Sequence, residues 1–344
     1  MISENQMARY TVTVGGNQVD QQEPDGLEYI CVEDHVDMIG VCELTFAAGK
    51  GTAWSSLAVG GPVDVKLGGD TRPVFVGTIT SLRHGFKKGR ATVTAVCMDP
   101  LVNLAASQRV FEWVKAGEEK TDSDVVNEVL GQAGVPIGTV DATTEMRKYI
   151  VQRNESDLTF VRRLAARNGF ICMANSGKVD WKKPQYEGGL VEIPQHELIT
   201  MDYQMNPRGI PTEITAYGWD YITKEKVEGT ATAGDIDTIG GGENAVSSAN
   251  VWQTPAFISD VWVNSQEGAK ELAKAELNRR ARNFLRGRAT VQGNGSLYVG
   301  GLVGFSGHAP GFNANAFIIS SRHRIFVRGG FTTELVFCSN TKPT

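Results

Sequence analysis

Apolar and polar residues alternate in short segments over residues 8–100, as they do in β-strands that bury one face. Three clear examples are Tyr10–Val14, Val41–Phe46 and Val63–Leu67. Glycine and aspartate residues separate such segments and supply the turns between them. This pattern predicts an antiparallel barrel or sandwich in the first hundred residues.

The spacing of apolar residues changes to a helical one after residue 100. Thr121 and Asp124 have the three-residue spacing of a capping box, and apolar pairs four residues apart follow them. A second helix is expected to begin with Asn154 as its N-cap and to end at Gly169. Strand segments come next, so residues 106–192 are expected to form a small α/β unit.

Strand character returns at Thr212–Tyr217, and a glycine-rich loop at residues 240–242 and one long helix follow. Asn264 is the predicted N-cap of this helix, and Glu267 would complete a capping box. The apolar side of the helix comprises Ala269, Ala273, Leu277 and Ala281.

Two stretches far apart in the sequence are similar and are interpreted as an internal repeat. Each begins with Val-Gly-Gly and reaches Arg-His after nearly the same distance. The matched positions are Val59, Gly60, Gly61, Arg83 and His84 in the first copy, and Val299, Gly300, Gly301, Arg322 and His323 in the second. Glu43–Thr45 also resembles Glu213–Thr215, which would place a long, helix-bearing insert inside the second copy.

These patterns predict a mainly β, α+β fold with two similar antiparallel β-barrel domains. An α/β insert would separate the barrels, and a loop and helix insert would interrupt the second barrel. The expected boundaries are 1–105 for the first barrel, 106–192 for the α/β insert, 193–230 with 287–344 for the second barrel, and 231–286 for the loop and helix insert.

The composition narrows the class of protein. The chain has 344 residues, of which 41% are hydrophobic and 21% charged, as expected of a folded globular protein. A net charge of −5 offers no excess of cations to a phosphate backbone, so specific nucleic-acid binding is not expected. No segment has the roughly twenty apolar residues of a membrane span, and the polar N-terminus lacks the apolar core of a signal peptide.

The candidate catalytic and metal motifs are incomplete. His196-Glu197 begins like a zinc-protease helix but lacks the second histidine that would share the metal. The glycines at 240–242 lack the Lys-Ser/Thr of a phosphate-binding loop. Asp34 and Asp37 resemble a glycosidase pair, but 39 acidic residues make such pairs frequent by chance. We therefore expect no catalytic, cofactor-binding or metal-binding residues, and no enzyme activity.

The segment from Val151 to Gly169 carries the most specific pattern in the chain. It resembles the Asn-Glu-Ser-Asp helix start, the following Phe-Val-x-Arg-Leu and the closing glycine of the phage tail baseplate hub proteins. That family is also called phage late control protein D, and the hub portion of type VI secretion spikes is similar to it. The matching positions are Asn154, Glu155, Ser156, Asp157, Leu158, Phe160, Val161, Leu164 and Gly169. Phe75–Thr80 and Ala216–Asp220 also resemble the family.

The resemblance implies a baseplate hub, a structural protein of a phage tail or contractile injection system. It implies a homotrimer in which two similar barrels per chain form a pseudo-sixfold ring. One side of the ring would meet the hexameric tail tube, and the other a trimeric spike supplied by a separate protein, with other baseplate proteins nearby. The chain would be made in the bacterial cytoplasm without a signal peptide and assembled into the virion.

Edge strands near residues 63–67 and 302–306 are expected to pair between subunits, because open sheet edges invite another strand. A second hypothesis is a carbohydrate-binding or peptidoglycan-acting module of the tail tip. That hypothesis requires Trp54, Trp219 and Trp252 to line an exposed groove. A third hypothesis, a cytoplasmic enzyme, lacks an assembled site in the sequence.

Overall fold

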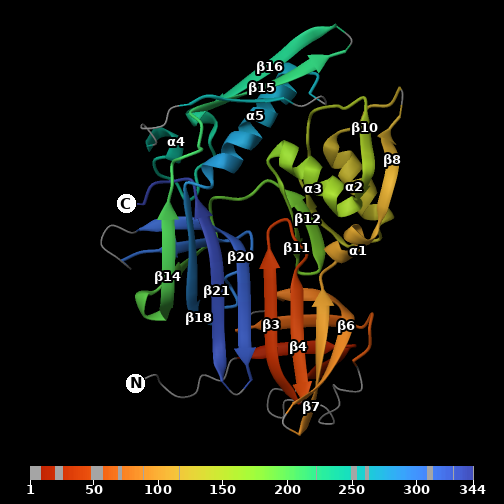
Figure 1. The fold of residues 1–344 in the computed structure, drawn as a ribbon, viewed down its shortest axis with the longest axis vertical. Helices are drawn as coiled ribbons and strands as arrows, with labels where there is room; N and C mark the ends of the chain where they lie inside the picture. The colour runs from red at the N-terminus through yellow and green to blue at the C-terminus, as the bar shows by residue number, and fades with distance from the viewer. Residues whose placement is uncertain are drawn as a thin grey trace.

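The computed structural model describes residues 9–343, apart from 20–25, 48–56, 69–71, 88, 116, 222, 249–253, 260–262, 308–312 and 328. Within these residues, one mostly antiparallel sheet of thirteen strands combines strands from the N-terminal and C-terminal parts of the chain. The mainly β, α+β fold class expected from the alternating pattern is confirmed. The α/β unit and a helix-bearing insert lie beside the sheet (Figure 1).

The first half of the sheet is built from the N-terminal hundred residues. Its strands, in spatial order, are β2 (Asn17–Val19), β1 (Tyr10–Val14), β5 (Pro62–Leu67), β6 (Phe75–Lys87), β7 (Arg90–Met98), β4 (Val41–Ala47) and β3 (Leu27–His35). The alternation along these strands becomes an alternation of burial, since Tyr10, Val12 and Val14 all face the core.

The second half of the sheet comes from the C-terminal part of the chain. Its strands are β20 (Ala314–Phe326), β21 (Gly330–Ser339), β18 (Leu285–Gln292) and β14 (Leu198–Met205), with β19 (Leu302–Phe305) and β13 (Leu190–Ile193) branching from β20. β13 runs parallel to β19, and the other pairs are antiparallel.

The two halves join through β3 and β20, which lie side by side although they come from opposite ends of the sequence (Figure 1). The pairing runs from Ser320 opposite His35 to Phe326 opposite Tyr29. The rings of Tyr29 and Phe326 meet at 4.9 Å. Among the described strand pairs none closes either half into a separate barrel, so the two expected barrels are two halves of one continuous sheet.

The α/β unit follows the first half directly. It contains α1 (Leu101–Ala106), β8 (Gln108–Val114), α2 (Asp122–Gln132), β9 (Ile137–Val140), β10 (Ile150–Ser156), α3 (Asp157–Asn168), β11 (Ile171–Asn175) and β12 (Lys178–Lys182). Its core is organised around the fully buried Trp113, Phe160 and Trp181. The indole of Trp113 stacks on Phe160 with ring centroids 6.0 Å apart.

The N-caps of α2 and α3 differ in how well the sequence predicts them. The capping box of Thr121 and Asp124 is present at the start of α2. The N-cap of α3 is Ser156, whose hydroxyl accepts from the Thr159 N–H at 3.2 Å, and not Asn154 as expected. Asn154 instead adopts a left-handed φ of +52° where β10 shifts register against β8, a conformation that asparagine tolerates better than most residues.

The insert lies between β14 and β18. It contains β15 (Glu213–Asp220), β16 (Glu225–Thr232), α4 (Ala245–Ser248), β17 (Ala256–Ser259) and α5 (Gln266–Ala281), and two single 3₁₀ turns, Gln195–Glu197 and Ala233–Asp235, precede β14 and follow β16. The three strands form a sheet of their own, and α5 covers one face of it. Ser265 is the N-cap of α5, because its hydroxyl accepts from the Gly268 N–H, so the expectation of Asn264 is wrong.

The position of β15 also differs from the sequence expectation, which placed Glu213–Thr215 in the second barrel opposite Glu43–Thr45. Small residues explain why β15 and β16 lie elsewhere. A Cβ built on Gly229 would lie 2.2 Å from the Lys270 backbone nitrogen, and one on Gly218 would lie 2.0 Å from the Val263 carbonyl. These glycines let α5 and the segment before it pack directly on the strands.

Candidate functional site

The two Val-Gly-Gly segments make the same turn in both halves of the sheet. Gly60 donates its N–H to the Ile79 carbonyl at 2.8 Å, and Gly300 donates to the Ile318 carbonyl at 3.0 Å. Each isoleucine N–H returns a bond to the second glycine of its own segment at 2.9 Å. Gly60 has φ of +86° and Gly300 of +82°, a region in which glycine is favoured.

Both halves also interrupt their strand ladders at matching places. The register shifts fall between Ile79 and Ser81 in β6, Ile318 and Ser320 in β20, Leu27 and Tyr29 in β3, and Leu198 and Thr200 in β14. The equivalence therefore covers five strands, with β3, β4, β5, β6 and β7 corresponding to β14, β18, β19, β20 and β21. Sequence reasoning missed β14 and β18, because they share little with β3 and β4 beyond alternation.

The matched histidines have different surroundings. His323 on β20 is 2% exposed, and its Nδ1 lies 3.0 Å from the Thr333 hydroxyl. Burial lowers the pKa of His323 to about 4, although a backbone hydrogen bond with Leu297 opposes the shift. His84 on β6 is exposed. The difference follows from β3, which lies beside the outer part of β20 but has no described counterpart beside β6.

The open edges of the sheet are not where the sequence placed them. β5 lies between β1 and β6, and β19 lies between β13 and β20, so the expectation that strands near 63–67 and 302–306 are edges is wrong. Among the described strands, β14 pairs only with β18. The outer part of β6, from Ser81 to Lys87, has only β7 as a strand neighbour within the described residues.

The family-motif helix α3 holds the α/β unit together. Leu158, Phe160, Val161 and Leu164 are buried in its core. Asp157 is fully buried at the first turn of α3, where the helix dipole favours a carboxylate. It accepts hydrogen bonds from Arg109 and from Gln152, the latter at 2.9 Å.

Gln152 also links Asp157 to the core, because its Oε1 accepts a hydrogen bond from the Trp113 indole N–H at 3.1 Å. Glu155, near the end of β10, pairs with Arg163 in the middle of α3 at 2.7 Å. These contacts of Asp157, Gln152 and Glu155 therefore fix the junction of β10, β8 and α3.

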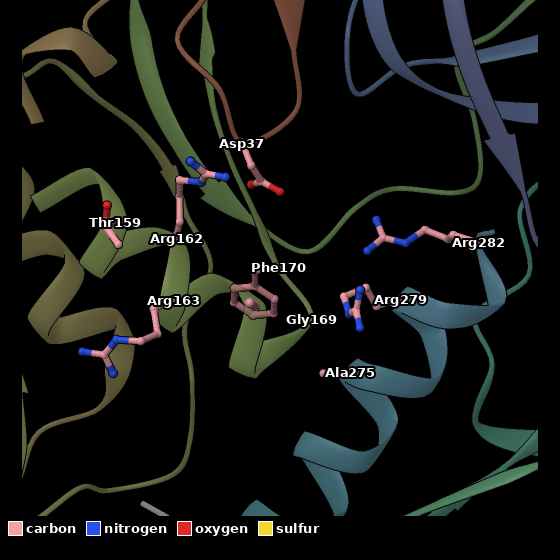
Figure 2. A pocket seen from close by; sticks show the side chains of 10 residues that line it. Asp37, Thr159, Arg162, Arg163, Gly169, Phe170, Ala275, Arg279 and Arg282 are labelled. Carbon is pink, nitrogen blue, oxygen red and sulfur yellow. The ribbon is translucent and has the colours of Figure 1, made fainter. Parts of the chain in front are cut away.

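A pocket of about 350 Å³ lies between α3 and α5. Figure 2 shows arginine side chains entering it from both helices. The pocket is lined by Asp37, Thr159, Arg162, Arg163, Ala166, Gly169, Phe170, Ala275, Arg279 and Arg282. Gly169 ends α3 in the left-handed conformation, and a Cβ there would lie 3.3 Å from the Ala275 Cβ. Glycine and alanine thus let the end of α3 approach α5 closely.

The arginines around this pocket differ in their acidic partners. Arg163 is paired with Glu155, and Arg279 with Glu276 at 2.7 Å. Burial raises the pKa of Asp37, while a hydrogen bond from the Cys172 N–H at 2.8 Å and the nearby guanidinium groups of Arg162 and Arg282 oppose the shift. The described lining residues bring four arginines around the single carboxyl group of Asp37, and guanidinium groups are the usual partners of anionic groups.

A buried charge network ties the α/β unit to the start of α5. Asp122, at the first position of α2, is paired with Arg167 from α3, and its carboxylate also accepts from Asn168 at 2.8 Å. Arg147 pairs with Glu145 at 2.5 Å, and Glu145 accepts from the Ser265 hydroxyl at 2.8 Å. Because Ser265 caps α5, this network fixes the insert against the α/β unit.

The isolated chemical motifs are dispersed in the fold. Asp34 lies close to Asp99, since a Cβ on Gly40 would lie within 3.2 Å of carboxylate oxygens from both residues. Burial, with Asp99 adding to it, raises the pKa of Asp34 to about 7, and burial raises that of Asp99 to about 6. His196 is exposed beside Glu197.

Gly240 lies at a close contact, where a Cβ would be 2.3 Å from Asn315, and its N–H donates to the Tyr186 carbonyl at 3.0 Å. Over the described part of the chain, no group of three or more histidine, cysteine, aspartate or glutamate residues is arranged to hold a metal ion. No helix in that part is long and apolar enough to cross a membrane.

Comparison with known proteins shows which family the chain belongs to. The family described as the Alg8 N-terminal domain matches residues 4–326, which is most of the chain. The chain belongs to the Alg8 N-terminal domain family. No curated protein matches it in sequence.

Solved structures show which fold this Alg8 N-terminal domain protein has. A tail protein from Neisseria meningitidis MC58 superposes with a TM-score of 0.70 at 14% identity, covering 96% of this chain and 97% of that one. The 43 kDa tail protein of prophage MuSo2 from Shewanella oneidensis gives 0.70 at 15% identity, covering 96% and 98%.

A third similar structure is an E. coli protein described as a component of the type VI secretion system with structural similarity to phage T4 tail proteins. It gives a TM-score of 0.64 at 13% identity, covering 97% of this chain and 79% of that one. The chain therefore has the fold of phage tail and type VI secretion proteins, and the resemblance to the baseplate hub family is confirmed.

Proposed function

We propose that this Alg8 N-terminal domain protein is the structural hub of a contractile or phage-like tail. Three copies form a pseudo-sixfold ring that joins the hexameric tail tube to a separate trimeric spike. The protein works mechanically, as an adaptor between two symmetries, and is not an enzyme. Its site of action is the baseplate of the assembled virion or tail-like particle, where it contacts other baseplate proteins.

One observation carries this proposal. Two equivalent sets of five strands, with the same glycine turns and the same register shifts, lie side by side in a single sheet. A trimer of such chains contains six similar units, so a threefold particle on one side can meet a sixfold one on the other. The fold shared with solved tail proteins supports the same conclusion.

The division of the chain follows from this role. Residues up to 105 supply the first ring unit, and residues 193–205 with 285–344 supply the second. Residues 106–189 form the α/β unit, which we place outside the ring together with the insert at 206–284, while β13 (Leu190–Ile193) stays in the sheet beside β19. The network through Glu145 and Ser265 would hold these outer parts in one position relative to each other.

The test is the mass of the purified protein in solution, measured alone and after mixing with the spike and tube proteins. A trimer with six similar lobes in averaged electron micrographs is the expected result. A monomer at all concentrations that also fails to trimerise with the spike protein would contradict the proposal.

The carbohydrate-binding alternative keeps one supporting observation. Trp219 is 43% exposed on β15, and Tyr217, two residues away on the same face, stacks with Phe257 of β17 at 6.1 Å. Exposed aromatic faces of this kind can stack against sugar rings. Trp54 and Trp252 lie outside the described residues. Retention of the wild-type protein, but not of a Tyr217→Ala/Trp219→Ala variant, on peptidoglycan would favour this alternative.

A further inference from the structure

The joint between the two halves of the sheet is a complete antiparallel pairing. Seven residues of β20, from Ser320 to Phe326, lie opposite seven of β3, from His35 to Tyr29. Residues that face the core across this joint are buried on both sides, and Ile325 lies opposite Ile30 with both side chains 0% exposed. On the opposite face, Arg322 pairs with Glu33 at 2.5 Å.

β6 and β14, the strands equivalent to β20 and β3, each have an edge without a neighbouring strand among the described residues. β6 corresponds to β20, and its residues 81–87 correspond to 320–326, because the register shift falls at the same isoleucine in both. β14 corresponds to β3, because both shift register one residue after their first leucine. Within the described residues, the free side of β6 and the free side of β14 each lack a neighbouring strand.

The side chains on these two edges have the chemistry of a buried joint. Phe86 on β6 is 77% exposed, although its counterpart Ile325 is buried. Met205 on β14 is 48% exposed, and Met201 on the same face is partly buried against the core of the second half. On β6 the face with Phe86 also carries Leu82 and His84, and on β14 the face with Met205 carries Met201 and Tyr203. Large side chains on one face of an open edge strand are typical of a strand that pairs with another.

We infer that the outer part of β6 pairs antiparallel with β14 of a second copy of this chain, in the register of the internal β20–β3 joint. Transferring that register places Leu82 opposite the partner subunit's Met205, Arg83 opposite the partner subunit's Gln204, and Phe86 opposite the partner subunit's Met201. The contact is head to tail, so each copy uses β6 toward one neighbour and β14 toward the other. The inference rests on the proposed function, and it adds which strands meet and in what register.

The register gives the inference a sharp test. Residues directly opposite in an antiparallel pair have Cα atoms about 4.5–5.5 Å apart, which suits a disulfide. Within one chain, six strands lie between β6, which carries Phe86, and β14, which carries Met201, so a disulfide between cysteines placed there must join two chains. The Phe86→Cys/Met201→Cys variant should therefore give a disulfide-linked trimer after mild oxidation.

Leu82→Cys/Met201→Cys is the matched control, because its cysteines would be four residues out of register and roughly 13 Å apart. We expect at least roughly tenfold less covalent trimer from it, since a disulfide needs Cα atoms within about 7 Å. Wild-type protein measures the background from the native cysteines, four of which are buried.

The outcomes separate the inference from the function on which it rests. Trimers that form natively but cross-link equally in both double variants, or in neither, overturn the strand pairing and leave the hub proposal standing. Covalent dimers from Phe86→Cys alone show a symmetric β6–β6 contact and also overturn it. If a double variant fails to fold, the Phe86→Cys chain is mixed with the Met201→Cys chain and oxidised, and a disulfide-linked dimer of the two chains is expected. If the two chains form trimers together but no such covalent dimer appears, the inference is contradicted.

Discussion

The two halves of the sheet have the same strands, turns and register shifts, yet equivalent side chains differ widely in exposure. Ile325 on β20 is buried, whereas its counterpart Phe86 on β6 is exposed, and the same contrast separates His323 from His84. The difference lies in the neighbour, since β3 covers the outer part of β20. The burial of equivalent positions in this repeated sheet is therefore decided by which strand lies alongside.

The largest expected effect comes from a charge placed at the two equivalent positions. Ile325→Asp puts a carboxylate into the joint with β3 and should lower the free energy of unfolding by about 4 kcal/mol or more. Phe86→Asp changes an exposed residue and should alter the stability of the dilute monomer by less than about 0.5 kcal/mol, while abolishing the trimer. Urea unfolding followed by circular dichroism, together with the native mass, measures both effects. Equal destabilisation by the two substitutions would contradict the comparison.

The next effect concerns acid. The unfolded chain protonates His323 below about pH 6.5, but the folded chain does so only near its lowered pKa of about 4. Stability is therefore lost as pH falls through this window, by up to about 3 kcal/mol. His323→Gln should remove that loss, so its unfolding free energy should depend less on pH between 6.5 and 4.

His84→Gln is the matched control for this acid effect, because His84 occupies the equivalent position on β6 and is exposed. Urea titrations at a series of pH values provide the measurement. An unchanged pH dependence in His323→Gln would show that this histidine is not the source of the acid sensitivity.

A smaller effect is expected at the two glycine turns. Gly60→Ala forces a left-handed φ on alanine and should cost about 1 kcal/mol. Gly300→Ala should cost more, about 2 kcal/mol, because its Cβ would also lie 3.0 Å from the Met173 sulfur. Thermal unfolding of both variants ranks them, and a larger loss from Gly60→Ala would show that packing around the two turns is not what distinguishes them.

The smallest effect concerns the charged face of the internal joint. Arg322 bonds Glu33 at 2.5 Å and lies 3.7 Å from Glu334, but these side chains are well exposed to solvent. Arg322→Ala should therefore cost no more than about 1 kcal/mol, and less at high salt. The equivalent Arg83→Ala should leave the monomer unchanged. A salt-independent loss from Arg322→Ala would indicate lost packing in place of a lost ion pair.

Local patterns in the sequence predict much of this fold. The alternation along the N-terminal strands, the capping box of Thr121 and Asp124, and the left-handed end of α3 at Gly169 all depend on neighbouring residues. The N-caps of α3 and α5 were misplaced because asparagine stands near a serine in both cases, and only the backbone decides which residue is the cap.

Long-range features were harder to predict. The pairing of β3 with β20, the separate sheet of β15 and the arginine-lined pocket between α3 and α5 depend on how distant segments meet. The repeat itself could be found from the Val-Gly-Gly turns, where the backbone demands glycine. Its extension into β14 and β18 could not, because many alternating sequences satisfy the same strand position.

The β3–β20 joint also sets an order of events during synthesis. β3 leaves the ribosome early, and its partner β20 is made only near the end of the chain. At roughly 5–20 residues per second, the edge of β3 stays open for on the order of 15–60 s. Each nascent chain therefore passes through a period in which the open edge of β3 can pair with the outer part of β6 in any finished copy nearby. Completion of the C-terminus ends that period, because a strand tethered to the same chain outcompetes one arriving from solution.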